Sequence, residues 1–229
     1  MKSFTVSAAV AVAGLASLVK AQVPGFDISG YQETTDFKKA YADGDRFVII
    51  KATEGTSYKS SLFGKQYDGA TAAGLIRGAY HFAQPASSSG AAQAKYFAAN
   101  GGGWTGDGIT LPGALDIEYN PSGDTCYGLS QSAMVDWIED FVTAYQGETT
   151  RWPLIYTTLD WWTQCTGNSA AFADRCPLWL ARYADSPGTP PAGWDFQTVW
   201  QYNSKYGQGG DSDTFNGDES RLVALATGE

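Results

Sequence analysis

Histidine is almost missing from this chain, which has one, His81, in 229 residues. A Ser-His-Asp catalytic set could use only that residue, and a metal site built from several histidines is not supported. Basic residues are also few, with 15 Lys and Arg against 24 Asp and Glu and a net charge of −9. Phosphate contacts need a basic surface, so we expect no nucleic acid among the partners.

Long apolar runs are scarce as well. The first 21 residues have Lys2 near the start, an apolar middle and small residues up to Ala21, which is typical of a secretory signal peptide. A membrane anchor is the alternative, but this run is too short and too Ala-rich to span a bilayer, and no later run is suitable. We therefore expect a secreted protein without membrane contact, in which residues 22–229 form a single domain.

Short strand-like runs recur along the chain, with helix-like segments between several of them. The expected helices cover 62–74, 88–103 and 130–147, the last capped by Ser130 and ended by Gly147. This alternation indicates parallel βαβ units, and one domain with so many strands predicts an α/β fold: an irregular, TIM-like (β/α) barrel with about eight strands and fewer helices. The expected strands are 25–29, 46–54, 76–83, 111–119, 153–158, 177–184, 198–203 and a short piece around 211–215.

Two carboxylates stand at the end of the apolar run in LPGALDIEYNP. Residues two apart on a strand share a face, about 6.5 Å apart, so Asp116 and Glu118 should both face the barrel mouth, where Asp27 can join them. Crowded carboxylates cannot all ionise, so at least one pKa rises. A protonated carboxylic acid beside an ionised one is the arrangement that glycosidic cleavage needs.

Two alternative roles for this carboxylate pair remain open. One is a salt bridge with Lys51 or Arg182, which would neutralise a buried charge. The other is a Mg²⁺ or Ca²⁺ site, because these ions bind clustered carboxylates. The sequence contains no phosphate cradle that would accompany such an ion, and we expect no metal.

In β/α barrels the chemistry lies at the C-terminal ends of the strands. Here those ends carry mostly acidic and aromatic residues, and aromatic rings stack on sugar faces. For His81, a hydrogen bond at the rim is the alternative to substrate contact. The residues predicted to bind substrate are Glu54, Tyr80, His81, Tyr156, Arg182, Gln201, Tyr202, Asp211 and Asp213.

Three cysteines in a secreted chain indicate one disulfide and one free thiol. Cys126 and Cys165 follow the fourth and fifth expected strands, so they lie in neighbouring loops on one rim, whereas Cys176 precedes the sixth strand at the opposite end. A disulfide needs Cα atoms within about 7 Å. We predict a Cys126–Cys165 disulfide, with Cys176 free and buried.

The motifs FDIS, KATEG, GAYHFA and LDIEY, in this order at the first four strands, resemble glycoside hydrolase family 25, the Chalaropsis-type lysozymes, and in particular its fungal secreted branch. The resemblance continues through PLIYTT, WQY and DSDTFNG. It implies cleavage of the β-1,4 bond between N-acetylmuramic acid and N-acetylglucosamine in the glycan strands of peptidoglycan. At matching positions it implies Glu118 as general acid, Asp116 as its partner and Asp27 as a supporting carboxylate.

The resemblance also ranks the two acids of the last strand. The family pattern often has Asn where Asp213 stands, which favours Asp211 as the residue of the active face. We expect a monomer that uses no cofactor.

Other functions and mechanisms stay open. Chitinase-like N-acetylglucosaminidases of family 18 also carry D-x-E on the fourth strand, although their pattern has Asp where this chain has Ala114. A non-catalytic cell-wall-binding lectin is a second alternative, although all three acids are present. The D-x-E pair could orient the substrate's own N-acetyl group, attack directly at a carboxyl separation of about 5–5.5 Å, or activate water at about 6.5–9.5 Å.

Overall fold

The computed structural model describes residues 22–229, and the predicted signal peptide, residues 1–21, lies outside the described residues. The strands of the described part are β1 Val23–Ile28, β2 Phe47–Glu54, β3 Tyr58–Lys59, β4 Ile76–Phe82, β5 Ala114–Asp116, β6 Leu154–Thr157, β7 Leu178–Ala181, β8 Val199–Asn203 and β9 Asp211–Phe215. Eight of them close into a barrel in the order β1-β9-β8-β7-β6-β5-β4-β2, because β1 pairs with β2 as well as with β9. The predicted irregular α/β barrel is confirmed.

The last barrel strand, β9, makes the barrel irregular. It runs antiparallel to both β8 and β1, whereas the strands from β1 to β8 that form the rest of the barrel pair in parallel. The beginning of β9 therefore lies at the same end of the barrel as the last residues of the other strands. In this register Asp211 is paired with Asp27.

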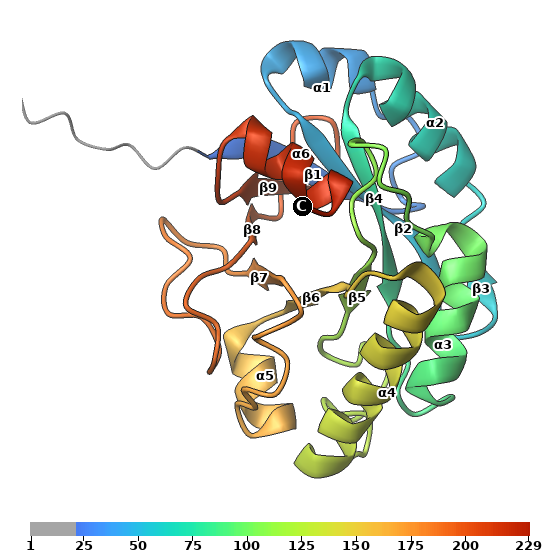
Figure 1. Ribbon diagram of the computed structural model, residues 1–229, viewed down its shortest axis with the longest axis vertical. Coiled ribbons are helices and arrows are strands. Elements are labelled where there is room, and N and C mark those ends of the chain that lie inside the picture. Colours follow the sequence, from blue (N-terminus) through green and yellow to red (C-terminus); the bar gives the residue numbers. More distant parts are fainter. Residues whose placement is uncertain (1–21) are drawn as a thin grey trace, which may run out of the picture.

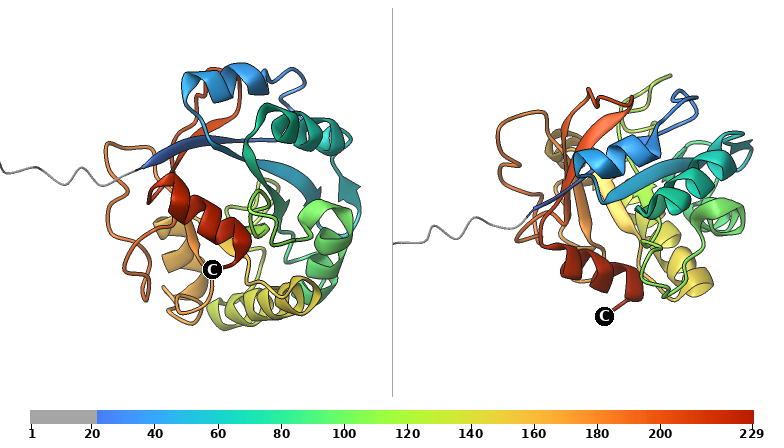
Figure 2. Two further views of the ribbon diagram at one scale, coloured as in Figure 1. Left: turned by 45° about the horizontal axis from the view of Figure 1, so that its top comes forward. Right: turned by 90° about the horizontal axis from the view of Figure 1, so that it is seen from above.

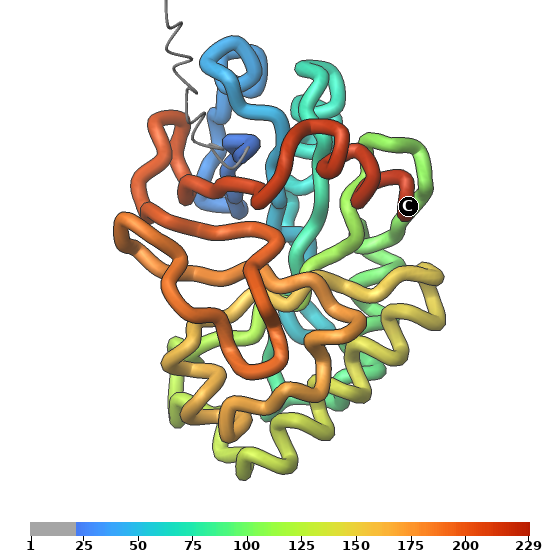
Figure 3. The backbone as a smooth tube through the Cα atoms, turned by 60° about the vertical axis from the view of Figure 1, so that its left-hand side comes forward, coloured from blue at the N-terminus to red at the C-terminus, as the bar shows by residue number. Residues whose placement is uncertain are grey.

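Helices cover one side of the barrel more completely than the other. Those within residues 22–229 are α1 Phe37–Asp43, α2 Phe63–Ala73, α3 Gly90–Phe97, α4 Gln131–Thr149, α5 Leu159–Thr166 and α6 Glu219–Thr227, with a π-helical turn, η1 Ala98–Gly102, after α3. Figures 1 and 2 show α1 to α5 around the outside of the barrel. The segments on either side of β8, residues 182–198 and 204–210, orange in Figure 3, run as loops, as their glycines and prolines predict.

The longest helix, α4, shows which end signals were reliable. Ser130 is its N-cap and accepts a hydrogen bond from the backbone N–H of Ala133, as predicted. The prediction that Gly147 ends the helix was wrong, because α4 continues to Thr149. Gly147 is exposed, whereas Thr149 is buried and its hydroxyl donates to the carbonyl of Tyr145. The packing of Thr149 therefore outweighs the helix-ending tendency of glycine.

Two apolar layers hold the fold together. The outer layer lies between the strands and the helices and includes Leu115, Phe141 and Ile155, and the inner layer fills the barrel. Each fully buried Leu, Ile or Phe stabilises the fold by about 1.5–3 kcal/mol relative to exposure. Leu222 and Ala226 of α6 belong to the inner layer, so this helix covers the end of the barrel at which the parallel strands begin.

A disulfide joins the loop after β5 to α5. It links Cys126 and Cys165, whose Cα atoms are 5.3 Å apart, and Cys176, immediately before β7, is free and buried. This is the pairing predicted from the topology. Among residues 22–229, none of the helices combines the length and the apolar character that crossing a membrane requires.

Candidate active site

Alternation along the strands determines which residues point into the barrel mouth. Ala114 of β5 belongs to the inner apolar layer, so Asp116, two positions later, points inward, while Leu115 and Ile117 pack against the helices. The same alternation brings further side chains to this end of the barrel from six other strands, namely Asp27, Lys51, Tyr80, Tyr156, Gln201 and Asp211.

The carboxyl groups of Asp116 and Glu118 face each other within hydrogen-bonding reach, and Asp116 Oδ1 receives no N–H or O–H donor from the described residues. Burial raises the pKa of both carboxyls, that of Asp116 well above its usual range, and the nearby negative charge of Glu118 raises the pKa of Asp116 further. The positive charge of Lys51 acts in the opposite direction on both. Asp27 also lies within electrostatic reach of both. Burial and crowding therefore favour a protonated form for at least one carboxyl of the D-x-E pair, which is the state that glycosidic chemistry requires.

Asp27 is held by a network of neutral donors. Gln201 Nε2 donates to Asp27 Oδ2 at 2.7 Å and lies 3.1 Å from Asp211 Oδ2. Gln201 Oε1 accepts hydrogen bonds from Tyr156 Oη at 2.8 Å and Tyr183 Oη at 3.1 Å. Burial and the neighbouring charge of Asp211 raise the pKa of Asp27 to about 7. This network brings Asp27, Tyr156, Gln201 and Asp211 together, as predicted for residues of one site.

Lys51 and Glu54 form an ion pair beside these carboxyls. Lys51 Nζ lies 2.7 Å from Glu54 Oε2, and Gln84 Nε2 donates to Glu54 Oε1 at 2.9 Å. The ammonium group also lies over the rings of Phe82, at 4.6 Å, and Tyr58, at 5.5 Å. A cavity of about 320 Å³ continues outward from this pair, lined by Ser29, Gly30, Tyr31, Glu33, Lys51, Glu54, Tyr58, Ser61 and Leu62.

The ion pair between Lys51 and Glu54 bears on one alternative role of the D-x-E pair, a salt bridge with Lys51 or Arg182. Within residues 22–229 neither Asp116 nor Glu118 forms a salt bridge, because Lys51 is bonded to Glu54 and Arg182 to the carbonyl of Ser186. In the same part of the chain, no three or more His, Cys, Asp or Glu residues are arranged to hold a metal ion.

Tyr80 also reaches the site, whereas His81 does not. Tyr80 faces inward and lies within electrostatic reach of Asp27, Asp116 and Glu118. His81, the next residue, points outward and is fully buried, between Thr53 Oγ1 at 2.8 Å and Gln93 Oε1 at 2.9 Å. The expectation that His81 contacts substrate is therefore corrected: it is a hydrogen-bonded residue of the outer layer.

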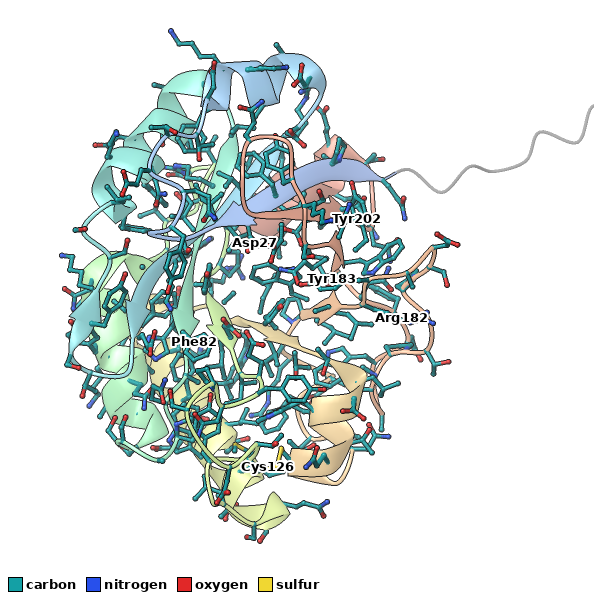
Figure 4. The ribbon with its side chains drawn as sticks, turned by 180° about the vertical axis from the view of Figure 1, so that it is seen from behind. Asp27, Phe82, Cys126, Arg182, Tyr183 and Tyr202 are labelled. Atoms are coloured by element: carbon teal, nitrogen blue, oxygen red, sulfur yellow. A yellow bond between two sulfur atoms is a disulfide. The ribbon has the colours of Figure 1, made fainter. Side chains whose placement is uncertain are left out.

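Arg182 and Tyr202 are likewise placed away from the carboxyls. Arg182 Nη1 donates to the carbonyl of Ser186 at 2.8 Å, and Figure 4 shows the arginine further from the centre of the barrel than Tyr183. Tyr202 packs on Trp200, with ring centroids 5.5 Å apart, on the outer wall of β8, since Gln201 between them points inward. The predictions that Arg182 and Tyr202 contact substrate are therefore corrected. Arg182 is bonded to the loop that follows it, and Tyr202 lies on the outer side of β8.

Asp213 is a further correction. Its side chain is fully buried, and Oδ1 accepts a 2.8 Å hydrogen bond from Trp179 Nε1. The residue lies beneath the site and not on its surface, so a bound sugar cannot reach it. The predicted set of site residues leaves out three contributors: Lys51, which was considered only as a salt-bridge partner of the acids, Trp179 beneath the acids and Tyr183 beside Gln201. Strict alternation from Ile49 and Ala181, which face inward, would have indicated Lys51 and Tyr183.

Comparison with known proteins agrees with this geometry. Residues 26–211 match the sequence profile of glycosyl hydrolases family 25. The chain belongs to family 25. Among family relatives it is similar to the N,O-diacetylmuramidase of Arthroderma benhamiae, at 56% identity over 90% of this chain and 87% of that protein. It is also similar to the N,O-diacetylmuramidase of Chalaropsis sp, at 55% identity over 90% of this chain and the whole of that protein.

Solved family 25 structures share the barrel. The muramidase from Acremonium alcalophilum is 76% identical to this chain with a TM-score of 0.90, and the similarity covers 90% of this chain and 100% of that one. A family GH25 lysozyme from Aspergillus fumigatus is 58% identical, with a TM-score of 0.89 and the same coverage. The resemblance to family 25 noted from the sequence motifs, and with it the assignment as a glycoside hydrolase, is confirmed.

Proposed function

We propose that this protein is a secreted muramidase, a lysozyme that hydrolyses the β-1,4 bond between N-acetylmuramic acid and N-acetylglucosamine in bacterial peptidoglycan. The observation that carries the proposal is the pair of facing carboxyls, Asp116 and Glu118, beside Asp27 at the barrel mouth. The relatives named as muramidases support the choice of substrate.

Glu118 is the general acid in this proposal. It is partly exposed, unlike Asp116, so the glycosidic oxygen can approach it. Before substrate binds, the proton of the pair is held mainly by Asp116, whose pKa is raised more than that of Glu118. An acetamido N–H that donates to Asp116 favours its ionised form, and the proton then moves to Glu118, which delivers it to the leaving oxygen.

Asp116 orients the acetamido group of the sugar. Carboxyls within hydrogen-bonding reach of each other, such as Asp116 and Glu118, are closer together than the acid and the attacking carboxylate of retaining enzymes, which are about 5–5.5 Å apart. No sugar carbon fits between them. The acetamido oxygen is therefore the nucleophile, and it forms a cyclic oxazolinium intermediate that water opens with Glu118 as base. Asp27, stabilised by Gln201, supports the cation-like transition state.

The cavity beside Lys51 and Glu54 accommodates a neighbouring part of the glycan. Tyr31 and Tyr58, on its wall, are 93% and 43% exposed, and exposed rings at the end of a barrel stack on sugar faces. Tyr119 and Tyr183 are also exposed at this end. The glycan strand is the partner in this proposal, and the protein acts as a monomer.

The proposal also includes secretion of the protein from the cell. Residues 1–21 have the pattern of a signal peptide, and residues 22–229 would then be the mature single domain. The disulfide supports this location, because such bonds persist in oxidising compartments outside the cytosol.

The test combines wall lysis with product analysis. The purified protein should clear a suspension of bacterial walls, and mass spectrometry should find N-acetylmuramic acid at the new reducing ends. Glu118→Gln, which preserves size, should reduce the rate about 10²–10⁴-fold with an unchanged melting temperature. Reducing-end N-acetylglucosamine would indicate the chitinase-like alternative, and wall binding without lysis would indicate a lectin; either result would refute the muramidase.

A further inference from the structure

Asp213 has a hydrogen-bonding pattern that an ionised carboxylate does not satisfy. It is fully buried, and Oδ1 accepts from Trp179 Nε1 at 2.8 Å. Oδ2 receives no N–H or O–H donor from the described residues, and no lysine or arginine pairs with Asp213 in that part of the chain. A buried negative charge with one oxygen unpaired is strongly unfavourable.

The carboxyl group of Asp27 supplies the missing partner. The carboxyl groups of Asp27 and Asp213 face each other within hydrogen-bonding reach. Two ionised carboxylates would both accept and would repel each other at this approach, whereas a proton on one of the two lets it donate to the other. The inward register explains the contact, because β9 places Asp213 opposite Gly25, which has no side chain to separate it from Asp27.

The amide of Gln201 determines which carboxyl carries the proton. Gln201 Oε1 accepts from Tyr156 and Tyr183, so its Nε2 must face the carboxyls and donates to Asp27 at 2.7 Å. This donor stabilises negative charge on Asp27. Asp213 is the more deeply buried of the two, and as a carboxylic acid it uses its carbonyl oxygen to accept from Trp179 and its hydroxyl to donate to Asp27.

We propose that Asp213 is a positioning residue that stays protonated across the working range of the protein and, like an asparagine amide, donates a fixed hydrogen bond to Asp27. The single negative charge of this buried pair then rests on Asp27, the member nearer the substrate. The inference rests on the proposed function only where it concerns the rate, since the proton on Asp213 is a property of the folded protein.

The charged and titratable groups around the pair favour the same arrangement. Burial, followed by the charge of Asp27, raises the pKa of Asp213 well above its usual range. The other titratable groups that face this pair include no positive charge. The carboxyl groups of Asp211 from β9 and Glu118 after β5 favour retention of the proton when they are ionised. The hydroxyls of Tyr80, Tyr156 and Tyr183 have raised pKa values and stay neutral.

Two substitutions test the proposal by rate. Asp213→Asn keeps both hydrogen bonds without a titratable proton, so its kcat for wall lysis should stay within about threefold of wild type. Asp213→Leu has similar volume but no donor, so kcat should fall at least about 30-fold while KM changes little. A loss of 30-fold or more in Asp213→Asn would overturn the proposal, because it would mean that the carboxyl itself is required.

Stability measurements test whether Asp213 is protonated in the folded protein, and they do not depend on enzymatic activity. Wild-type Asp213 is protonated when folded and ionised when unfolded above pH 4, so wild type should lose stability relative to Asp213→Asn as pH rises. The melting temperature of Asp213→Asn minus that of wild type should increase by several degrees between pH 5 and pH 8. A constant difference would show that Asp213 is ionised in the fold and would refute the proposal even if Asp213→Leu fails to fold. Difference infrared spectra should show the carbonyl stretch of a protonated carboxylic acid in wild type and not in Asp213→Asn.

Discussion

Gln201 donates a 2.7 Å hydrogen bond to Asp27, and its amide is held in that orientation by two tyrosine hydroxyls on its oxygen. The hydroxyls of Tyr156 and Tyr183 would clash electrostatically with an inverted amide. This part of the site is thus fixed before substrate binds, which is the condition for electrostatic stabilisation of a transition state.

Gln201→Glu replaces the donor by another carboxyl group. A hydrogen bond to a charged group is worth about 1.5–3 kcal/mol, so kcat/KM for wall lysis should fall about 10–150-fold. Tyr156→Phe keeps the glutamine and one of its two orienting hydroxyls, so a loss of about three- to tenfold is expected. Equal losses in both variants would contradict the idea that the donor itself is needed.

Asp116→Asn and Glu118→Gln should respond differently to the leaving group. An aryl β-glycoside of an N-acetylated sugar has a leaving group that needs little protonation, so Glu118→Gln should recover most of its rate on it. Asp116→Asn should remain about 10²–10³-fold slower than wild type on the same substrate, because this variant lacks the orienting carboxylate whichever substrate is used. Recovery of both variants would argue against the assigned roles.

The pH dependence of activity follows from the raised pKa values. Burial raises the pKa of Glu118, and the acid form is lost as the pH rises through that value. The net charge of −9 also opposes approach to anionic walls, and carboxyl protonation weakens this repulsion. We therefore expect an acidic optimum, measured as initial clearing rates at constant ionic strength. A maximum well above neutral pH would contradict this.

Stability should depend on pH in the same direction. The folded-state pKa values of Asp116 and Asp213 are raised by burial, so their favourable contribution to stability is complete below the unfolded value near 4 and is lost as the pH rises through the raised folded values. The melting temperature should fall by several degrees between pH 5 and pH 8. In Asp116→Asn this fall should be smaller.

The disulfide should contribute measurably to stability. Cys126 and Cys165 are 39 positions apart, and closing such a loop in the unfolded chain corresponds to about 3–4 kcal/mol. The double substitution to serine should lower the free energy of unfolding by about that amount in urea titrations. Cys176→Ala is the control, since it removes a buried thiol that is not bonded. A double serine variant as stable as wild type would show that the disulfide does not restrict the unfolded chain, and it would contradict this prediction.

Gly210 should not tolerate a side chain. It has φ +87°, and an added Cβ would lie 2.1 Å from the carbonyl oxygen of Asp27. Gly210→Ala should therefore lose more than about 2 kcal/mol of stability and displace Asp27, with a parallel loss of activity. Gly207→Ala in the same loop meets no atom within 4 Å and should be close to neutral.

The sequence predicted the barrel strands well, because each one is a short apolar run ended by polar residues. It missed α1, α5 and α6, which have only 7, 8 and 9 residues, and the two-residue β3. For the site, the carboxyls and the tyrosines were predicted from strand ends alone. His81, Tyr202 and Asp213 were misplaced because a list of strand ends ignores alternation and depth, which depend on register and on a strand that runs in the opposite direction.

The antiparallel course of β9 also determines where the chain can be attached to something else. Val23 is paired with Phe215, and α6 follows at the same end of the barrel, so residues 22 and 229 both lie on the face opposite the carboxyls. A bead or another domain could be fused at residue 229 without standing between the enzyme and an insoluble wall. Immobilised protein should then clear a suspension as readily as the free form, provided that the tether is long enough to reach the particles.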